Sequence, residues 1–369
     1  MHLLHYNFCY FFFRPMSVLA RIAGAAAAGL FAKEYFEHAI SHHGAWDQRT
    51  MSWAAVLSAV WAAWVCYSCR GRLIGAGACF LWVTTWLVTP FLVTFLLAFE
   101  VGILWALALW LFVGVLAPTV PQSNGFRAFI RNMSAWVDEH KIVGEFAQPK
   151  GSKPVMYCHH PHGHVAILSC ASGSEVDCAG VAAPPIFKMP FCKQMMNLMG
   201  SISSAPAPFK EALRSGRNVA ILPGGVEEVV LSSSDVERAY IQNRKGFVKY
   251  AIQFGYDLVP VYHFGETQLY SLLWPFDVPW VVKLRLAIAQ KFQIATGVGV
   301  GYRHLPLVPN PRARCRTVVG ARVVLPHQPE VEREAVVKWH AEYVMKLQKL
   351  FDGHKRELPA YAKKELELW

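Results

Sequence analysis

The stretch "RKGFVKYAIQFGYDLVPVYHFG" at residues 244–265 changes its hydrophobic periodicity halfway along. Residues 244–255 space their apolar side chains as a helix does and end at Gly255, a natural helix C-cap. Residues 257–265 form an apolar, strand-like run that ends at Gly265. Because a helix followed directly by a buried strand is the building unit of α/β proteins, this stretch predicts that fold class.

The same alternation extends over the second half of the chain. Further strand-like runs occupy 153–160, 217–225 and 316–326, while residues 208–216 and 331–355 have helical spacing. This order predicts an α/β domain with a mostly parallel sheet flanked by helices. In such sheets ligands bind beyond the carboxyl ends of the strands, where the sequences HHPHGH and LPGG would lie.

The composition indicates contact with lipid. Of the 369 residues, 54% are hydrophobic and 17% are charged, whereas a typical soluble domain has about 25% charged residues. The net charge of +11 favours anionic lipid headgroups or anionic substrates such as coenzyme A phosphates. We predict no nucleic-acid binding, since no basic run is interleaved with aromatic residues. The nine cysteines form no disulfide or zinc framework, which predicts buried thiols in a reducing, cytosol-facing setting.

Two apolar stretches predict membrane segments. Residues 51–69 carry no charge, and residues 73–116 carry only Glu100. A span needs about 20 apolar residues, so the second stretch predicts a transmembrane hairpin with spans at about 73–93 and 95–116. Residues 51–69 are a candidate third span. Basic residues flank the hairpin on both sides, which predicts that it enters and leaves the membrane on the cytosolic side.

Three regions follow from these patterns. Residues 1–50 form an N-terminal segment, residues 51–120 a membrane-embedded region, and residues 121–369 the α/β domain. The composition shifts after 117–125, "APTVPQSNG", where long apolar runs give way to short strand-like and helical ones. We therefore expect the chemistry to lie in the third region.

The segment "YCHHPHGHVAI" at 157–167 contains four histidines within six residues, and three interpretations stay open. Together with "HAISHH" at 38–43, it is compatible with a metal site of a membrane metalloenzyme such as a lipid hydroxylase. His159 and His164 are expected to be structural rings, and Cys158 to point into the core. Alternatively, a neutral imidazole in this loop is a general base for an alcohol. The chain has no GxSxG nucleophile elbow for covalent catalysis.

A family resemblance rests on five motifs in a fixed order. They are HPHG (160–163), FKMP (187–190), LPGGVEE (222–228), NRKGFVKYAIQFGYDLVPVYHFGE (243–266) and VVG (318–320). The chain resembles the diacylglycerol/monoacylglycerol acyltransferases of the type-2 kind, which also include wax-alcohol acyltransferases. The resemblance covers about 155–355 and the preceding membrane hairpin. It implies a glycerolipid-acyltransferase-like fold and transfer of an acyl group from acyl-CoA to a lipid hydroxyl.

The resemblance also implies site residues. In the HPHG tetrad plant relatives have Glu-Pro-His-Ser, so His162 is the expected general base, with His160 and Glu228 as further catalytic residues. Backbone N–H groups near Gly224 and Gly225 are expected to stabilise the oxyanion. The expected substrate-binding residues are Pro161, Gly163, Gly224, Gly225, Arg244, Lys245 and Gly246, of which Arg244 and Lys245 would bind coenzyme A phosphates. No metal and no cofactor is expected, since acyl-CoA is a co-substrate.

The favoured function is therefore a membrane-bound O-acyltransferase that converts diacylglycerol to triacylglycerol. Monoacylglycerol and fatty alcohol are the alternative acceptors, and the metalloenzyme is the alternative of a different class. Expected partners are acyl-CoA, diacylglycerol or a related lipid alcohol, membrane lipids and, as a further candidate, a second copy of the chain. The expected location is the endoplasmic reticulum membrane, multi-pass with the catalytic domain facing the cytosol, and lipid droplets as a second place. Arg322 departs from the family pattern, which usually has proline there.

Overall fold

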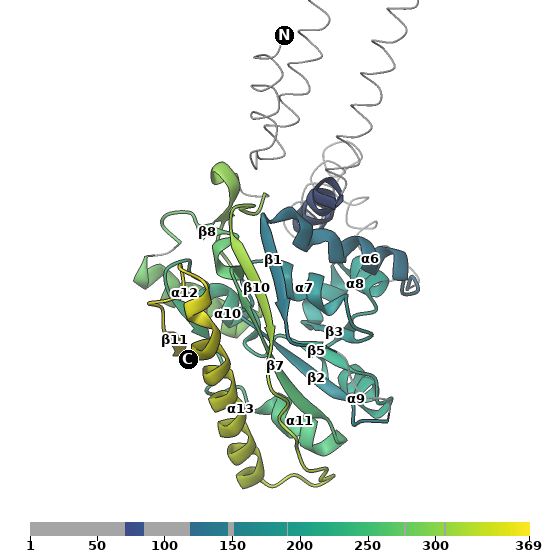
Figure 1. Cartoon of the computed structure of the whole chain (residues 1–369). Helices are drawn as coiled ribbons and strands as arrows, with labels where there is room; N and C mark the ends of the chain where they lie inside the picture. Colours follow the sequence, from purple (N-terminus) through teal and green to yellow (C-terminus); the bar gives the residue numbers. More distant parts are fainter. Residues whose placement is uncertain (1–70, 85–118, 147–150, 190, 277, 306–307) are drawn as a thin grey trace, which may run out of the picture. The chain divides into compact units, whose positions relative to one another are not determined.

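The structure is a computed structural model, and its chain divides into two compact units, Met1–Leu73 and Ile74–Trp369. The second unit holds nearly all of the residues described below. The described residues are 71–84, 119–146, 151–189, 191–276, 278–305 and 308–369. Within the second unit a central sheet is covered by helices, so the predicted α/β class is confirmed (Figure 1).

Seven strands form the central sheet in the order β1-β10-β7-β2-β5-β3-β4. They are β1 (Glu139–Val143), β2 (Val155–His160), β3 (Ala179–Ala182), β4 (Ile202–Ser203), β5 (Val219–Ile221), β7 (Asp257–Phe264) and β10 (Arg314–Val319). Among the described residues, the only antiparallel pairing in this sheet is that of β10 with β7. The sheet is thus mostly parallel, as predicted.

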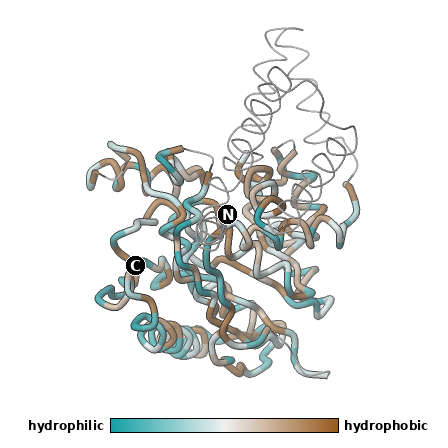
Figure 2. The backbone as a smooth tube through the Cα atoms, turned by 45° about the horizontal axis from the view of Figure 1, so that its top comes forward, coloured by the Kyte–Doolittle hydropathy of each residue, from teal (hydrophilic) through white to brown (hydrophobic). Residues whose placement is uncertain are grey.

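Helices pack on the sheet in two groups. The helices are α6 (Asn124–Arg131), α7 (Ile167–Gly173), α8 (Cys192–Met199), α9 (Pro206–Arg214), α10 (Gly225–Leu231), α11 (Gly246–Phe254), α12 (Pro279–Phe292) and α13 (Arg333–His354). Helices α9, α11 and α13 share the main hydrophobic core with the sheet, whereas α6, α7 and α8 build a second cluster (Figure 1). Hydrophilic and hydrophobic residues alternate along α13, as expected for a helix with one buried face (Figure 2).

Short elements complete the fold. Two small sheets pair β6 (Glu237–Ala239) with β11 (Leu366–Leu368), and β8 (Ser271–Leu272) with β9 (Gly299–Val300). The 3-10 turns are η2 (Asn132–Trp136), η3 (Pro184–Lys188), η4 (Glu266–Gln268), η5 (Tyr302–His304) and η6 (Lys355–Glu357). The β6–β11 pairing joins the C-terminal end of the chain to the segment that follows α10.

The two central strands, β2 and β7, are buried on both faces along their whole length. Side chains of a strand alternate between its faces. On β2, Met156 and Cys158 therefore enter the core below α11 and α13, as predicted for Cys158, while Val155 and Tyr157 belong to a small cluster on the opposite face. Continuous burial of this kind is typical of parallel strands.

The strand expected at 316–326 is shorter than the sequence indicated, because β10 ends at Val319. Its antiparallel partner strand carries Pro260 opposite the next position, and proline has no N–H to donate to the ladder. The Gly320 N–H still donates to the Pro260 carbonyl at 2.8 Å, after which the chain turns away. A single bridge, between Leu258 and Val323, is all that follows in the described region.

Only the beginning of the predicted membrane hairpin is described. Residues 71–84 are helical, and Ala78, Cys79, Trp82 and Val83 are buried in the cluster of α6, α7 and α8. The Trp82 indole N–H donates to the Val165 carbonyl at 2.7 Å. No helix of the described ranges has both the length and the apolar character to cross a membrane. The candidate span 51–69 and most of 73–116 lie outside the described residues.

Candidate functional site

Three loops meet at one edge of the sheet because β7, β2 and β5 are adjacent and parallel. The loop after β2 carries HPHG, the loop after β5 carries the Gly224–Gly225 pair, and the loop after β7 begins at Gly265. Carboxyl ends of parallel strands are the usual ligand site of such sheets. The structure therefore brings the loops that carry the predicted site residues together at this edge.

His160 is the last residue of β2, and none of its surface is exposed. Its Nδ1 lies 3.4 Å from Glu228 Oε1, and its Nε2 lies 3.0 Å from the hydroxyl of Tyr343 on α13. Both ring nitrogens thus have partners inside the core, and the buried Pro161 follows directly. A ring held in this way positions the loop and has no face toward a substrate.

Glu228 on α10 holds the HPHG loop to the rest of the site. The carboxylate is 2% exposed. Its Oε1 accepts from the backbone N–H of His162 at 2.8 Å, and its Oε2 accepts from the N–H of Tyr240 at 3.2 Å. Gly224 makes room for this carboxylate, because a Cβ at residue 224 would lie 1.6 Å from Oε2. The glycine is required here by close packing, since its own φ of −68° is ordinary.

His162 is the partly exposed histidine of the tetrad. Its Nδ1 lies 3.2 Å from the carbonyl oxygen of Gly163. A carbonyl only accepts, so Nδ1 carries the proton and Nε2 keeps its lone pair. Burial lowers the pKa of His162 below its ordinary 6.5, against the carboxylate of Glu228 and the Gly163 carbonyl, which raise it. The ring is therefore neutral at pH 7, as a general base must be.

A second buried acidic side chain, Glu266, supports the same loop and was not among the residues predicted for the site. Its two oxygens accept from the N–H groups of Ile167 at 2.9 Å and Leu168 at 2.7 Å, at the start of α7. Burial raises the pKa of Glu266 to about 8, although these two hydrogen bonds lower it. Gly163 has φ +63° and lies against this side chain, so a Cβ there would be 2.6 Å from Glu266 Cγ. The sequence signal that could have pointed to Glu266 was its position just after β7, as the last residue of the family-like block 243–266.

Arg244 and Lys245, expected as a pair, have different surroundings. The guanidinium of Arg244 forms an ion pair with the buried Glu227 and lies 5.1 Å from the ring centroid of Tyr240. Arg244 is therefore part of the framework behind the site. Gly246 is the first residue of α11, and a Cβ added there would meet nothing within 4 Å, so no close approach requires a glycine at this position.

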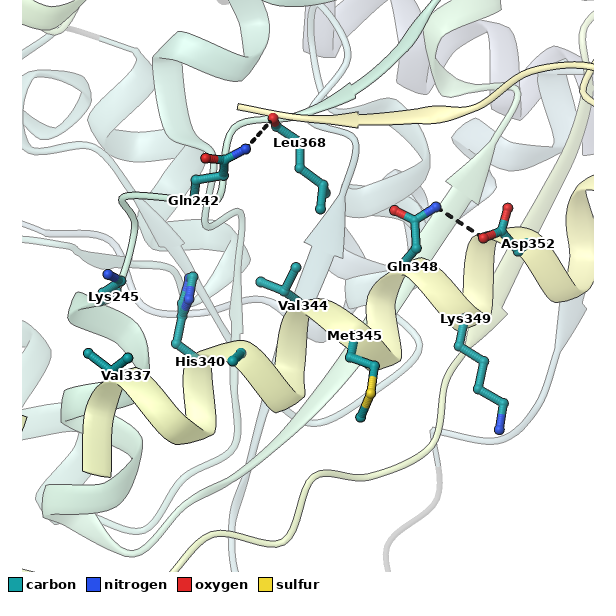
Figure 3. Close-up of a pocket in the computed structure, with 11 residues that line it drawn as sticks. Gln242, Lys245, Val337, His340, Val344, Met345, Gln348, Lys349, Asp352 and Leu368 are labelled. Carbon is teal, nitrogen blue, oxygen red and sulfur yellow. Dashed lines mark hydrogen bonds between the residues drawn. The ribbon is translucent and has the colours of Figure 1, made fainter. Parts of the chain in front are cut away.

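Lys245 instead lines a groove of about 770 Å³ along the outer side of α13. The loop before α11, α13 itself and β11 contribute its walls (Figure 3). Its apolar lining residues include Val344, Met345 and Leu368, and Lys349 is a second cation beside it. The groove and the site share α13, because Tyr343 of this helix contacts His160.

The expected oxyanion donors are only partly available. The N–H of Gly225 donates to the carbonyl of Leu222 at 3.0 Å, within the turn that starts α10. Gly225 has φ +58°, a conformation that favours glycine. Because its N–H already donates to Leu222, Gly225 is not an oxyanion donor in this structure. A glycine at this position is instead favoured by the positive φ.

A family model described as diacylglycerol acyltransferase matches residues 156–368, more than half of the chain. The chain belongs to the diacylglycerol acyltransferase family. It is 27% identical to diacylglycerol O-acyltransferase 2 of Dictyostelium discoideum over 69% of this chain and 84% of that protein. It is 30% identical to acyl-CoA wax alcohol acyltransferase 1 of Homo sapiens over 67% of this chain and 80% of that protein.

A solved structure is also similar to this chain. The crystal structure of the 1-acyl-sn-glycerophosphate (LPA) acyltransferase PlsC from Thermotoga maritima aligns with a TM-score of 0.39 and 12% sequence identity. The alignment covers 61% of this chain and 77% of that chain.

The other two histidines of the segment, His159 and His164, have partners of their own. His159 Nδ1 lies 2.8 Å from His263 Nε2, and His263 Nδ1 lies 2.9 Å from the Thr317 hydroxyl, inside the sheet. His164 packs edge-on against the ring of Tyr270. In the described part of the chain no three His, Cys, Asp or Glu side chains are grouped as metal ligands would be. The segment 38–43 lies outside that part.

Arg322, which departs from the family pattern, has a structural partner. Its Nε lies 2.7 Å from Oδ2 of the buried Asp257, the first residue of β7. The second oxygen, Asp257 Oδ1, accepts from the N–H of Leu325 at 3.0 Å. Arg322 thus neutralises the buried Asp257 where β7 begins. The candidate site lies at the other end of the strands, so Arg322 is not part of it.

Proposed function

We propose that this chain is an acyl-CoA-dependent diacylglycerol O-acyltransferase that forms triacylglycerol. Membership of the family and the similarity to diacylglycerol O-acyltransferase 2 over most of both chains support the reaction. The observation that carries the proposal is the geometry of His162, whose backbone is fixed by Glu228 and whose Nδ1–H is fixed by Gly163. This arrangement leaves Nε2 as a base beside the carboxyl ends of the central strands.

In the proposed reaction, His162 Nε2 takes the proton of the acceptor hydroxyl as its oxygen attacks the thioester carbonyl. The new C–O bond forms, the C–S bond breaks, and the imidazolium returns the proton to the leaving coenzyme A sulfur. A thioester is already activated, so the main tasks of the protein are to deprotonate and position the alcohol. His160 and Glu228 are positioning residues, because both act through the loop that carries His162.

Fatty alcohol and monoacylglycerol are the second candidate acceptors. The similarity to acyl-CoA wax alcohol acyltransferase 1, at 30% identity, supports the fatty alcohol. All three acceptors present a hydroxyl beside a long apolar chain, so the same base serves each of them. The acceptor preference then depends on the surfaces around the site and not on the catalytic residues.

We also propose that the protein is anchored in the endoplasmic reticulum membrane, with the α/β domain on the cytosolic side. The apolar run 73–116, interrupted only by Glu100, supports a hairpin of two spans, and the net charge of +11 supports contact with anionic lipid. Acyl-CoA is a cytosolic substrate and diacylglycerol a membrane lipid. The boundary between water and bilayer is therefore where both substrates meet.

The acceptor assay tests this proposal. Membranes that contain the chain receive labelled acyl-CoA with diacylglycerol, monoacylglycerol or a long-chain alcohol, and the labelled products are separated. Membranes of the same host without the chain measure the background. The proposal predicts triacylglycerol as the main product above that background. Wax ester as the main product would reassign the acceptor, and no labelled ester above background would refute the reaction.

A further inference from the structure

The segment 271–305 forms a compact module at one side of the site. Strand β8 pairs with β9 at its base, and α12 lies between them in the chain. Arg285 of α12 is buried and donates to the carbonyls of Thr296 and Phe276, which fixes the helix to the loops on both of its sides. Helix α12 packs against α10, the helix that carries Glu228, so the module adjoins the elements of the site (Figure 1).

This module presents large apolar side chains to the outside. Trp280 is 68% exposed and Leu284 is 53% exposed, and they are one helical turn apart on the exposed side of α12, next to the buried Val281 and Arg285. Further exposed apolar side chains are Phe292, the last residue of α12, and Trp274, Ile294 and Leu305 in the loops beside the helix. We call these six residues the α12 apolar face. Single exposed apolar side chains are common on protein surfaces, but several of them on one module indicate a site that binds a partner.

The charge around the α12 apolar face is positive. Within the module, residues 271–305, the sequence contains one acidic residue, Asp277, against two lysines and two arginines. Lys283 and Lys291 are exposed on α12 itself, on the same side as Trp280 and Leu284. Helices that lie in a membrane interface typically carry tryptophan and leucine together with lysine. Phosphate headgroups of anionic lipids complement this charge.

We propose that the α12 apolar face docks on the surface of a phospholipid bilayer with anionic headgroups. Trp280 and Leu284 enter the interface, while Lys283 and Lys291 contact lipid phosphates. Docking places α12, and with it the neighbouring α10 and Glu228, at the bilayer surface, where a lipid acceptor can reach the site by lateral diffusion. The inference concerns a surface of the α/β domain and is separate from the membrane hairpin; its link to catalysis rests on the proposed function.

Photo-crosslinking of the full chain in vesicles tests the docking. p-Benzoylphenylalanine replaces Leu284 in one variant and Met345 in a control variant. Met345 is 62% exposed on α13, also in an apolar surface with lysines nearby, so the two probes differ mainly in the surface that they report. Vesicles of phosphatidylcholine alone and of phosphatidylcholine with phosphatidylserine are irradiated, and lipid adducts are measured by mass spectrometry. A third probe at Trp280 repeats the measurement if the first variant fails to fold.

The proposal predicts abundant lipid adducts at 284 and few at 345, with phosphatidylserine raising the yield at 284. Replacing Lys283→Gln and Lys291→Gln should weaken docking on phosphatidylserine vesicles about fivefold for each lysine and leave phosphatidylcholine vesicles unaffected. Equal lipid adducts at both positions would overturn the proposal. A covalent link between two copies of the chain at 284 would overturn it as well and assign the face to self-association. Because no catalysis is measured, the result is independent of whether acyl transfer is found.

Discussion

At the scale of single residues, neighbouring histidines of one motif have opposite surroundings. His160 is buried between Glu228 and Tyr343, whereas His162 is partly exposed with one ring nitrogen free for chemistry. The sequence could predict that an imidazole acts here, and the resemblance favoured His162. It could not show that His160 has both nitrogens occupied, because Tyr343 lies 183 residues away in the chain. The geometry separates a base from a positioning residue.

The lowered pKa of His162 predicts the pH dependence of the reaction. A base that must be neutral loses activity as the pH falls through its pKa. Since burial holds this pKa below 6.5, the acidic limb of kcat/KM should lie below pH 6.5. Glu228→Gln keeps an oxygen for the His162 N–H and removes the charge that raises this pKa. The acidic limb of kcat/KM for Glu228→Gln should therefore lie at a still lower pH than in the parent. This shift is expected even if the kcat of the variant is reduced. An upward shift in Glu228→Gln would contradict the assignment of the limb to His162.

Arg244 and Lys245 should respond differently to substitution by glutamine. Lys245→Gln removes a cation from the groove and should raise the KM for acyl-CoA about tenfold if it contacts a phosphate, because a hydrogen bond to a charged group is worth about 1.5–3 kcal/mol. Arg244→Gln leaves the buried Glu227 without its cation and should lower the melting temperature instead. Kinetics and thermal unfolding of both variants measure this difference. An unchanged acyl-CoA KM in Lys245→Gln would exclude Lys245 as a phosphate contact.

At the scale of elements, the loop after β2 and the loop after β7 fit closely at Gly163 and Glu266. Gly163→Ala should be strongly destabilising, because the new Cβ would overlap with Glu266 as well as occupy a left-handed conformation. Gly216→Ala is the matched control: its φ of +69° is similar, but nothing lies within 4 Å of the added Cβ. The control should cost only the left-handed conformation, about 1–2 kcal/mol. Equal melting temperatures of the two variants would show that the fit of the loops adds nothing.

Elements with a clear period could be predicted, and those shaped by distant contacts could not. The helical spacing of 244–255 and of 331–355 predicted α11 and α13, and the apolar run at 257–265 predicted β7. β10 stops early because Pro260, far away in sequence, cannot continue its ladder. α12 was not predicted, since its apolar residues lie on its exposed as well as its buried side and weaken the helical period.

At the scale of the whole molecule, the C-terminal segment is tied to the site's supporting network. Lys364 lies 3.2 Å from the fully buried Glu237, which also accepts from the hydroxyls of Tyr262 and Thr267. The hydroxyl of Tyr361 accepts from the N–H of Gly265 at 2.7 Å, at the start of the loop after β7. The last residues of the chain therefore stabilise the region that follows β7.

Replacing Lys364 tests this connection. Lys364→Met leaves Glu237 as an unpaired buried charge, which typically costs about 3–5 kcal/mol. Lys363→Met, at the exposed neighbouring position, is the control and should change stability little. Thermal unfolding in detergent, together with transferase activity, should fall only in the first variant. If both variants unfold at the same temperature as the parent, the C-terminal segment contributes no stability to the site.

The order of segments predicted the α/β class and the mostly parallel sheet, because strand and helix alternate along the chain and a parallel sheet follows from that order. Such a sheet places HPHG and the Gly224 turn together without any knowledge of side-chain contacts. The supporting roles of the acidic side chains Glu266 and Glu237 could not be predicted, since each gains its role only from backbone or hydroxyl donors brought near by folding.

The central claim, that His162 is the general base of acyl transfer to diacylglycerol, is tested most directly by one rate measurement. Membranes with matched amounts of parent, His162→Ala and His354→Ala chains receive labelled acyl-CoA and diacylglycerol. His354, at the end of α13, is the control histidine. Loss of a general base typically lowers the rate about 10²–10⁴-fold, so triacylglycerol formation should fall by that factor in His162→Ala and remain near the parent rate in His354→Ala. Triacylglycerol formation by His162→Ala within a few-fold of the parent rate would contradict the account.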